Sequence, residues 1–302
     1  MLLKPSTRGI LKRHGLRLDR ALHNWVYFFF YKPYVRAAFF SQRLIERRLL
    51  WFKPLARPVR AVFNRYHSKV LSGGDVKKIL TLDRDVLLGP DKEKRIIPFA
   101  FANKVIFREP NLIAVMDCPC KAATKSPCKP VNCCIAVGRD FAPIWLEHCR
   151  ERYHARQVTQ EEALALIETM RKTGHIQQAF LKVGTGGLTG VICNCCPRCC
   201  VSLDASRIAK KIDAGLYMNA ESGYSVKRDA EKCSACGHCA EACPFDAVVM
   251  KEGVPVYDKA LCMGCELCAD GCPNGALRLY ADPDKVLPLD LDLARKELGE
   301  KS

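Results

Sequence analysis

Cysteine is the residue type in this sequence most able to do chemistry: there are 19 cysteines among 302 residues, most of them in the segments 118–134, 193–200 and 233–272. The odd count argues against a complete disulfide framework. The basic N-terminus lacks the apolar run of a secretory signal, so we expect a reducing cytoplasm, where disulfides are rare. Clustered thiols there predict metal ligation, because soft thiolates select iron–sulfur clusters or zinc.

The last cysteine segment is an internal repeat. The pattern C-x2-C-x2-C-x3-C-P occurs at 233–244 and again at 262–273, a constant offset of 29 residues. In this spacing three cysteines of a run bind one [4Fe–4S] cube and the fourth binds the other cube. Zinc ribbons use cysteine pairs at longer separation instead. The predicted ligands are Cys233, Cys236, Cys239 and Cys272 for cluster I, and Cys262, Cys265, Cys268 and Cys243 for cluster II.

These motifs carry a family resemblance. Residues 226–282 resemble a bacterial-type two-cluster ferredoxin, which implies a ferredoxin-like fold and one-electron transfer at low potential between two close clusters. With the upstream "DCPCK", "CCIAVG" and "CNCC" segments, roughly residues 95–280 are similar to a family of 4Fe–4S dicluster proteins with an extra N-terminal cysteine-rich domain. Arg198 stands where those relatives often carry another cysteine. This second resemblance implies iron–sulfur cofactors more than a particular role.

The crowded cysteines upstream predict additional metal ligands. One candidate set is Cys118, Cys120, Cys128 and Cys134; a second comes from Cys193, Cys195, Cys196, Cys199 and Cys200. Adjacent cysteines rarely face one metal, so we expect the second group to be divided between two sites or to share ligands with the first. One or two further iron–sulfur clusters, a structural four-cysteine zinc site and a thiol redox relay are all open interpretations.

Other residues of these types have plainer interpretations. Cys149 stands alone on the apolar face of a predicted helix, so we expect an inert core cysteine. His148, His154 and His175 lie among charged residues, so we expect them to be solvated.

The elements that position these residues predict an α+β protein in four parts. We expect a basic amphipathic helical arm at 1–75, an α/β cysteine-rich domain at 76–225, the ferredoxin-like domain with its 29-residue repeat at 226–282, and a tail at 283–302. Helices are predicted near 98–107, 142–153 and 159–174, and a strand at 111–116. Residues 72–75 have the composition of a linker, and the tail that of a spacer followed by a short charged helix.

The positive charge is concentrated in the arm. Residues 1–70 hold 16 of the 48 Lys and Arg residues but only two of the 32 acidic ones. Its apolar residues recur at helical spacing between arginines, a pattern that suits packing on the chain's own core or on a partner, or docking on an anionic membrane. Nucleic acid is disfavoured because no recognition fold follows. No apolar run is long enough to span a bilayer.

The sequence therefore predicts an iron–sulfur electron-transfer protein. It would carry single low-potential electrons between a donor and an acceptor protein in the cytoplasm, with docking on the inner membrane face as an addition. The alternatives are a catalytic iron–sulfur oxidoreductase subunit, with an open-site cluster in the middle domain, and an iron–sulfur sensor or scaffold. The sequence shows no Ser/His/Asp set and no HExxH motif.

Overall fold

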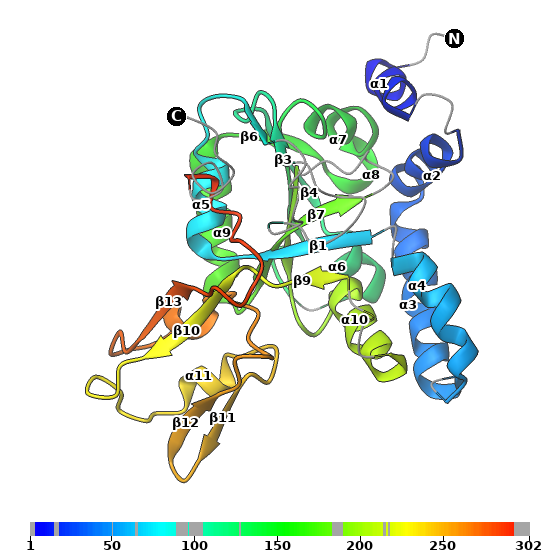
Figure 1. Cartoon of the computed structure of the whole chain (residues 1–302). Helices are drawn as coiled ribbons and strands as arrows, with labels where there is room; N and C mark the ends of the chain where they lie inside the picture. The colour runs from blue at the N-terminus through cyan, green and yellow to red at the C-terminus, as the bar shows by residue number, and fades with distance from the viewer. Residues whose placement is uncertain are drawn as a thin grey trace.

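The computed structural model describes residues 4–14, 18–49, 51–63, 66–88, 96, 105–126, 128–182, 190–213, 216 and 218–292. Its centre is a seven-stranded sheet with the order β6-β4-β5-β8-β7-β1-β9 (Figure 1). The strands are β1 Tyr66–Leu71, β4 Ile113–Asp117, β5 Asn132–Val137, β6 Arg156–Val158, β7 Ile176–Lys182, β8 Val191–Cys195 and β9 Asn219–Ala220. Neighbours are antiparallel except for β1 and β9, which are parallel. A separate hairpin pairs β2 Val86–Leu88 with β3 Val105–Phe107.

The two faces of the sheet bury different side chains. Helices α5 Gly73–Leu80 and α9 Gln160–Lys172 lie on one side, and α3 Tyr31–Leu44, α6 Pro119–Thr124 and α10 Val201–Ile212 on the other (Figure 1). Side chains alternate between the faces of a strand. In β4, Ile113 and Val115 therefore join the aliphatic core under α5 and α9, whereas Ala114 and Met116 join the core that contains the buried cysteines.

The basic N-terminal segment is helical and packs against this chain. It consists of α1 Pro5–His14, α2 Leu18–Phe29, α3, a π-helical turn Ile45–Leu49, a 3-10 turn Lys53–Leu55 and α4 Ala56–Phe63. Tyr31 and Val35 of α3 are buried, as is Phe63 of α4. The strand that follows, β1, lies inside the central sheet. Among the described residues, none of the helices combines the length and apolarity needed to cross a bilayer.

The C-terminal region is smaller and has its own two sheets. Strand β10 Tyr224–Arg228 pairs with β13 Leu277–Ala281, and β11 Val248–Lys251 pairs with β12 Val254–Tyr257. The short helices α11 His238–Glu241 and α12 Leu267–Asp270 contact each other. Helices and antiparallel strands are thus mixed in both regions, which confirms the α+β class.

Several predicted elements are confirmed. Strand β4 occupies the predicted apolar run. The helix predicted at 142–153 is present as two short helices, α7 Ala142–His148 and α8 Arg150–Tyr153, interrupted at Cys149. Helix α9 begins after Thr159, whose hydroxyl accepts a hydrogen bond from the Glu162 N–H. It ends at Lys172, shortly before Gly174 with its φ of +76°.

Three local predictions are wrong. Residues 105–107 form β3 and not a helix, while the rest of that predicted helix lies outside the described residues. The expected linker begins α5 with a capping box: Ser72 Oγ accepts from the Asp75 N–H, and the Asp75 carboxylate accepts from the Ser72 N–H. The expected spacer buries Leu289 and Leu291 in the aliphatic core, and residues 293–302 are not described.

Candidate metal centres

The eight cysteines of the C-terminal repeat lie in two groups. Cys233, Cys236 and Cys239 line one cavity together with Cys272, which comes from the other half of the repeat. In the second group, burial together with the neighbouring thiols of Cys243 and Cys262 raises the pKa of Cys265 to about 12. Burial is also the largest cause of the raised pKa of Cys268, followed by the thiols of Cys265, Cys262 and Cys243, with a smaller effect of Cys239 from the first group. Each group thus contains three cysteines of one half and the fourth cysteine of the other.

Equivalent backbone conformations recur 29 residues apart in this region. Ala235 and Gly264, the second residues after the first cysteine of each run, both have positive φ, of +54° and +65°. Gly237 and Glu266, just before α11 and α12, form a second such pair, with φ of +79° and +71°. These turns curl each loop toward its cysteines, so the two halves have the same local fold.

The fourth cysteine of each half accepts a backbone hydrogen bond. The Ala247 N–H lies 3.3 Å from Cys243 Sγ, and the Ala276 N–H lies 3.3 Å from Cys272 Sγ. Hydrogen bonds of this kind stabilise the negative charge on a ligating thiolate and tune the reduction potential of a cluster.

Six cysteines of the middle region form a closed ring of interacting thiols, which we call the thiol ring. In order around it they are Cys118, Cys120, Cys200, Cys195, Cys193 and Cys134, each close enough to the next for one thiol to shift the pKa of the other. All six line one cavity, which Tyr31 and Val35 of α3 and Phe180 of β7 help to close. The ring therefore draws thiols from two segments that are far apart in sequence, 118–134 and 193–200, onto one face of the sheet.

The thiol ring is largely buried, and neighbouring groups shift the pKa values of its cysteines. Hydrogen bonds from neighbouring thiols, first of all that of Cys120, hold the pKa values of Cys118 and Cys200 well below the ordinary range. The Lys121 side chain is buried beside it, with Nζ 2.9 Å from the Pro130 carbonyl oxygen. Cys133 contacts Cys118 from next to the ring; this contact raises the pKa of Cys133, and the Lys121 charge opposes the rise.

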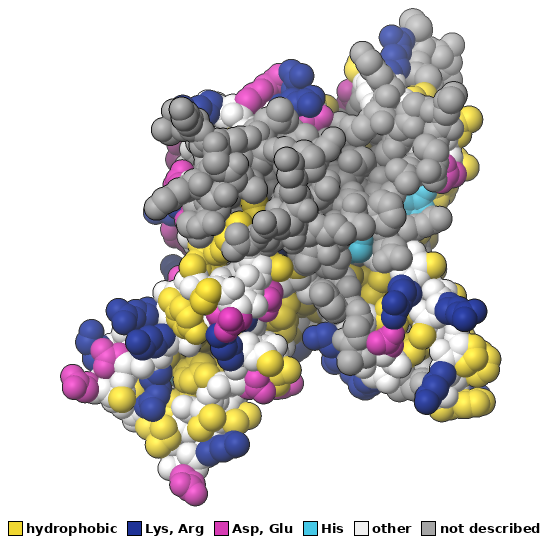
Figure 2. Space-filling view, in the orientation of Figure 1, with side chains coloured by type: hydrophobic (Ala, Val, Ile, Leu, Met, Phe, Trp, Pro, Cys, Tyr) yellow, Lys and Arg dark blue, Asp and Glu magenta, His cyan; other side chains and the backbone are white. Residues whose placement is uncertain are grey.

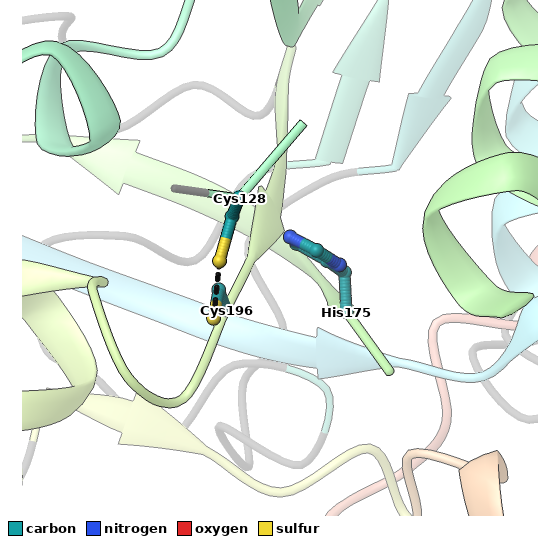
Figure 3. Close-up of side chains that lie close together, drawn as sticks. All are labelled: Cys128, His175 and Cys196. Atoms are coloured by element: carbon teal, nitrogen blue, oxygen red, sulfur yellow. Dashed lines mark hydrogen bonds between the residues drawn. The ribbon is translucent and has the colours of Figure 1, made fainter. Parts of the chain in front are cut away.

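A second group of cysteines lies beside the ring, and two of its members, Cys196 and Cys199, line the same cavity as the ring thiols. Cys128 Sγ is 3.4 Å from Cys196 Sγ, and Cys199 is hydrogen-bonded to Cys196. His175 joins Cys128 and Cys196, with all three ligand atoms within 4.8 Å of one another (Figure 3). Cys195 and Cys200 thus interact with the ring thiols, whereas Cys196 interacts with Cys128. The sequence grouped Cys128 with Cys118, Cys120 and Cys134, and that ligand set stays a prediction.

Sequence reasoning missed two residues of these groups. His175 was expected at the surface, but its side chain is only 2% exposed, so that prediction is wrong. The available signal was its place between the helix stop at Gly174 and the apolar start of β7. Cys133 was not predicted as a ligand and is also buried. Among the plainer interpretations, His154 is exposed and Cys149 is fully buried in the core, where burial raises its pKa to about 12.

A chain of hydrogen bonds joins the C-terminal region to the strands β5 and β8, which carry ring cysteines. Arg171 of α9 donates to the Cys265 carbonyl oxygen at 3.2 Å and to Gln177 Oε1 at 2.8 Å. Gln177 Nε2 donates to Asn194 Oδ1, and Asn194 Nδ2 donates to the Cys133 carbonyl oxygen, at 2.8 and 2.7 Å. The amides are buried, and the Arg171 charge is paired with Asp270 at 2.7 Å and Glu266 at 3.6 Å.

Comparison with known proteins identifies part of the chain. Residues 232–277 match the family model described as a 4Fe–4S dicluster domain. The matched segment is a 4Fe–4S dicluster domain. Its donor set fits that cofactor, because both cysteine runs are complete and each crossing cysteine joins the group of the other half. The chain is thus an iron–sulfur electron-transfer protein, and a cysteine-rich region precedes the matched domain. No curated protein matches the chain.

The pseudo-symmetry of the dicluster domain predicts different outcomes at Gly264 and Ala235. A Cβ at Gly264 would lie 2.1 Å from Ser222 Oγ and 2.4 Å from the Tyr224 carbonyl oxygen, so Gly264→Ala must displace its cysteine loop. We expect anaerobically purified Gly264→Ala to lose about half of the domain's iron, whereas the matched control Ala235→Gly keeps it. Iron and sulfide assays measure both, and full iron content in Gly264→Ala would contradict the packing argument.

Proposed function

We propose that this protein is an electron carrier with two [4Fe–4S] clusters in its dicluster domain and a further iron–sulfur cluster in the thiol ring. When bound, such clusters take up and release single electrons. The chain would hold cluster I with Cys233, Cys236, Cys239 and Cys272, and cluster II with Cys262, Cys265, Cys268 and Cys243. The observation that carries the proposal is the six-thiol ring, joined through Arg171 to the cluster II loop.

The composition of the thiol ring favours a cluster. A structural zinc ion takes four ligands in a closed tetrahedral site. The six ring thiols share one cavity with Cys196 and Cys199, which is more thiols than one zinc ion uses and enough to supply the four thiolates of a cube. A thiol relay needs access to a partner disulfide. Cys118, Cys134, Cys195 and Cys200 are instead buried, which favours ligation over exchange.

The Arg171 link favours electron transfer between the two regions. Cys265 and Leu267 of the dicluster domain share one core with Cys195 and Cys200 of the ring. The hydrogen-bonded path from the Cys265 carbonyl through Arg171 runs to the strands that carry ring cysteines. A packed and bonded medium of this kind supports passage of electrons from cluster II to the ring.

The exposed part of the dicluster domain suits a redox partner protein. Cys236, predicted on cluster I, is exposed, and so are Val249, Val254 and Val256 of the β11–β12 hairpin. An apolar surface close to a cluster allows a donor or acceptor to dock within electron-transfer distance. A catalytic subunit would instead need an open cluster position reached by a small substrate, and carbon monoxide or cyanide would then alter the spectrum of the reduced protein.

Counting iron and sulfide in anaerobically purified protein tests the proposed third cluster. We expect about twelve irons and about twelve sulfides per chain, with EPR signals of interacting reduced clusters. Cys195→Ser should lower the count, whereas the control Cys149→Ser should not, because burial alone, and no neighbouring thiol, shifts the pKa of Cys149. About eight irons in the wild type would remove the ring cluster, and a colourless protein without sulfide would remove the whole proposal.

The Arg171 charge should set the potential of cluster II. In Arg171→Met a positive charge beside the Cys265 carbonyl is lost, so reduction becomes less favourable and the midpoint potential becomes more negative. Arg156→Met is the control, because Arg156 also belongs to an ion pair, with Glu162, but is half-exposed. Potentiometric EPR measures both variants. An unchanged potential in Arg171→Met would contradict the electrostatic link.

We also propose that the N-terminal helices dock on an anionic membrane at the cytoplasmic face. The large apolar side chains Phe40 and Trp51 are 71% and 79% exposed, and Leu44 and Phe52 are exposed beside them. Arg36 of α3 and Arg47 and Arg48 of the π-helical turn are exposed in the same segment. Figure 2 shows basic and hydrophobic side chains interleaved where Figure 1 places α3 and α4. Aromatic and basic side chains together suit a negatively charged lipid surface.

Vesicle binding tests the membrane proposal. Phe40→Ser with Trp51→Ser should reduce co-sedimentation with phosphatidylglycerol vesicles by roughly tenfold or more, because two large apolar side chains are removed. Val249→Ser in the β11–β12 hairpin is the control and should bind like the wild type. Equal binding to neutral phosphatidylcholine vesicles, or no effect of the double substitution, would contradict an anionic lipid partner.

A further inference from the structure

His175 is a buried imidazole with one nitrogen left without a protein partner. His175 directly precedes the first residue of β7, and it is 2% exposed. Its Nδ1 lies 2.9 Å from Thr173 Oγ1. Its Nε2 is buried and, within the part of the chain that the structure describes, has no hydrogen-bond partner. A buried polar atom left in this way bears the full cost of its desolvation, so a bound group is expected at Nε2.

The groups that face this histidine are thiols. The ligand atoms of His175, Cys128 and Cys196 all lie within 4.8 Å of one another, and Figure 3 shows the His175 imidazole directed toward the two cysteines. Cys199 supplies a further thiol just outside this group, close enough to Cys196 and Cys128 for the three thiols to interact. The 196–199 segment is a C-x2-C turn, closed by the Cys199 N–H to the Cys196 carbonyl at 3.1 Å. Two cysteines at this spacing commonly supply a pair of ligands to a zinc site.

The spacing of these atoms fits one ion and not a cube. Thiolates on a tetrahedral zinc ion, at Zn–S of about 2.3 Å, lie about 3.8 Å apart. Cys128 Sγ and Cys196 Sγ are 3.4 Å apart, close to that value. Cysteines of a [4Fe–4S] cube lie further apart, because each binds a different iron. Among the described residues, no other three Cys, His, Asp or Glu side chains bring their ligand atoms within 4.8 Å, and that includes the cysteines of the dicluster domain.

We propose that Cys128, Cys196, Cys199 and the Nε2 atom of His175 bind a zinc ion. The Thr173 hydroxyl beside Nδ1 orients the imidazole, as second-sphere partners of metal-bound histidines do. Four protein ligands close the coordination shell, so the ion is structural. It fastens the loop around Cys128 to the start of β7 and to the 196–199 turn. That turn lies between Cys195 and Cys200, so the ion fixes the positions of two thiols of the ring.

Metal analysis with matched variants tests the zinc site. The protein is purified anaerobically from cells grown with zinc, and zinc and iron are measured together with zinc K-edge X-ray absorption. We expect about one zinc per chain, with about three sulfur ligands and one nitrogen ligand. His175→Ala and Cys128→Ser should lose most of the zinc and keep their iron. The controls His154→Ala, at an exposed histidine, and Cys149→Ser, at a buried isolated cysteine, should keep both metals.

The conservative variant His175→Cys keeps the proposal testable if His175→Ala does not fold. It should retain zinc, with a fourth sulfur in place of the nitrogen. Three results would overturn the site: a wild type without zinc, zinc with an unchanged nitrogen ligand in His175→Ala, or the loss of about four irons in Cys128→Ser, which would assign Cys128 to a cluster. The zinc site uses none of the six ring thiols. The zinc count therefore tests the zinc site, and the iron count separately tests the proposed cluster in the thiol ring.

Discussion

The alternation of side chains along β-strands is the constraint on which the middle region depends. Because neighbouring residues of a strand face opposite sides, the sheet separates an aliphatic face from a face that carries thiols. Strand β5 puts Ile135 and Val137 under α5 and α9, and Cys134 into the cavity on the other side. Strand β8 does the same with Cys193 and Cys195, on either side of Asn194. A rigid sheet thus holds thiols from distant segments at fixed separations, as preorganised metal binding requires.

The join between the two regions follows from the cost of burying charge. Arg171 is nearly buried, and an unpaired guanidinium there would be strongly unfavourable. Asp270 and Glu266 of the dicluster domain supply the opposite charge, while the Cys265 carbonyl and Gln177 accept the remaining hydrogens. Each region therefore depends on the other to complete the hydrogen bonds of one side chain. This dependence fixes how the dicluster domain lies against the sheet.

What the sequence predicts well is local. The dicluster loops follow from cysteines within eleven residues of one another, and α9 from its Thr159 cap and Gly174 stop. The meeting of Cys128 with Cys196 and His175 spans up to 68 residues and depends on sheet pairing, which a single sequence does not specify. In the segment 72–75 a local pattern was misread. Its glycines indicate a linker, but the Ser-x-x-Asp spacing also fits a capping box. The structure has the capping box, because the helix that it begins, α5, buries apolar residues.

The placement of α3 over the thiol ring has a further consequence. Tyr31 and Val35 form part of the wall around the ring thiols, so a helix from the basic N-terminal segment stands between them and bulk solvent. Dioxygen destroys many iron–sulfur centres that it can reach, and a close-fitting apolar wall slows its entry. The N-terminal helices are therefore part of the wall of this cavity, and a shortened chain beginning at β1 would leave the ring thiols open to solvent and air.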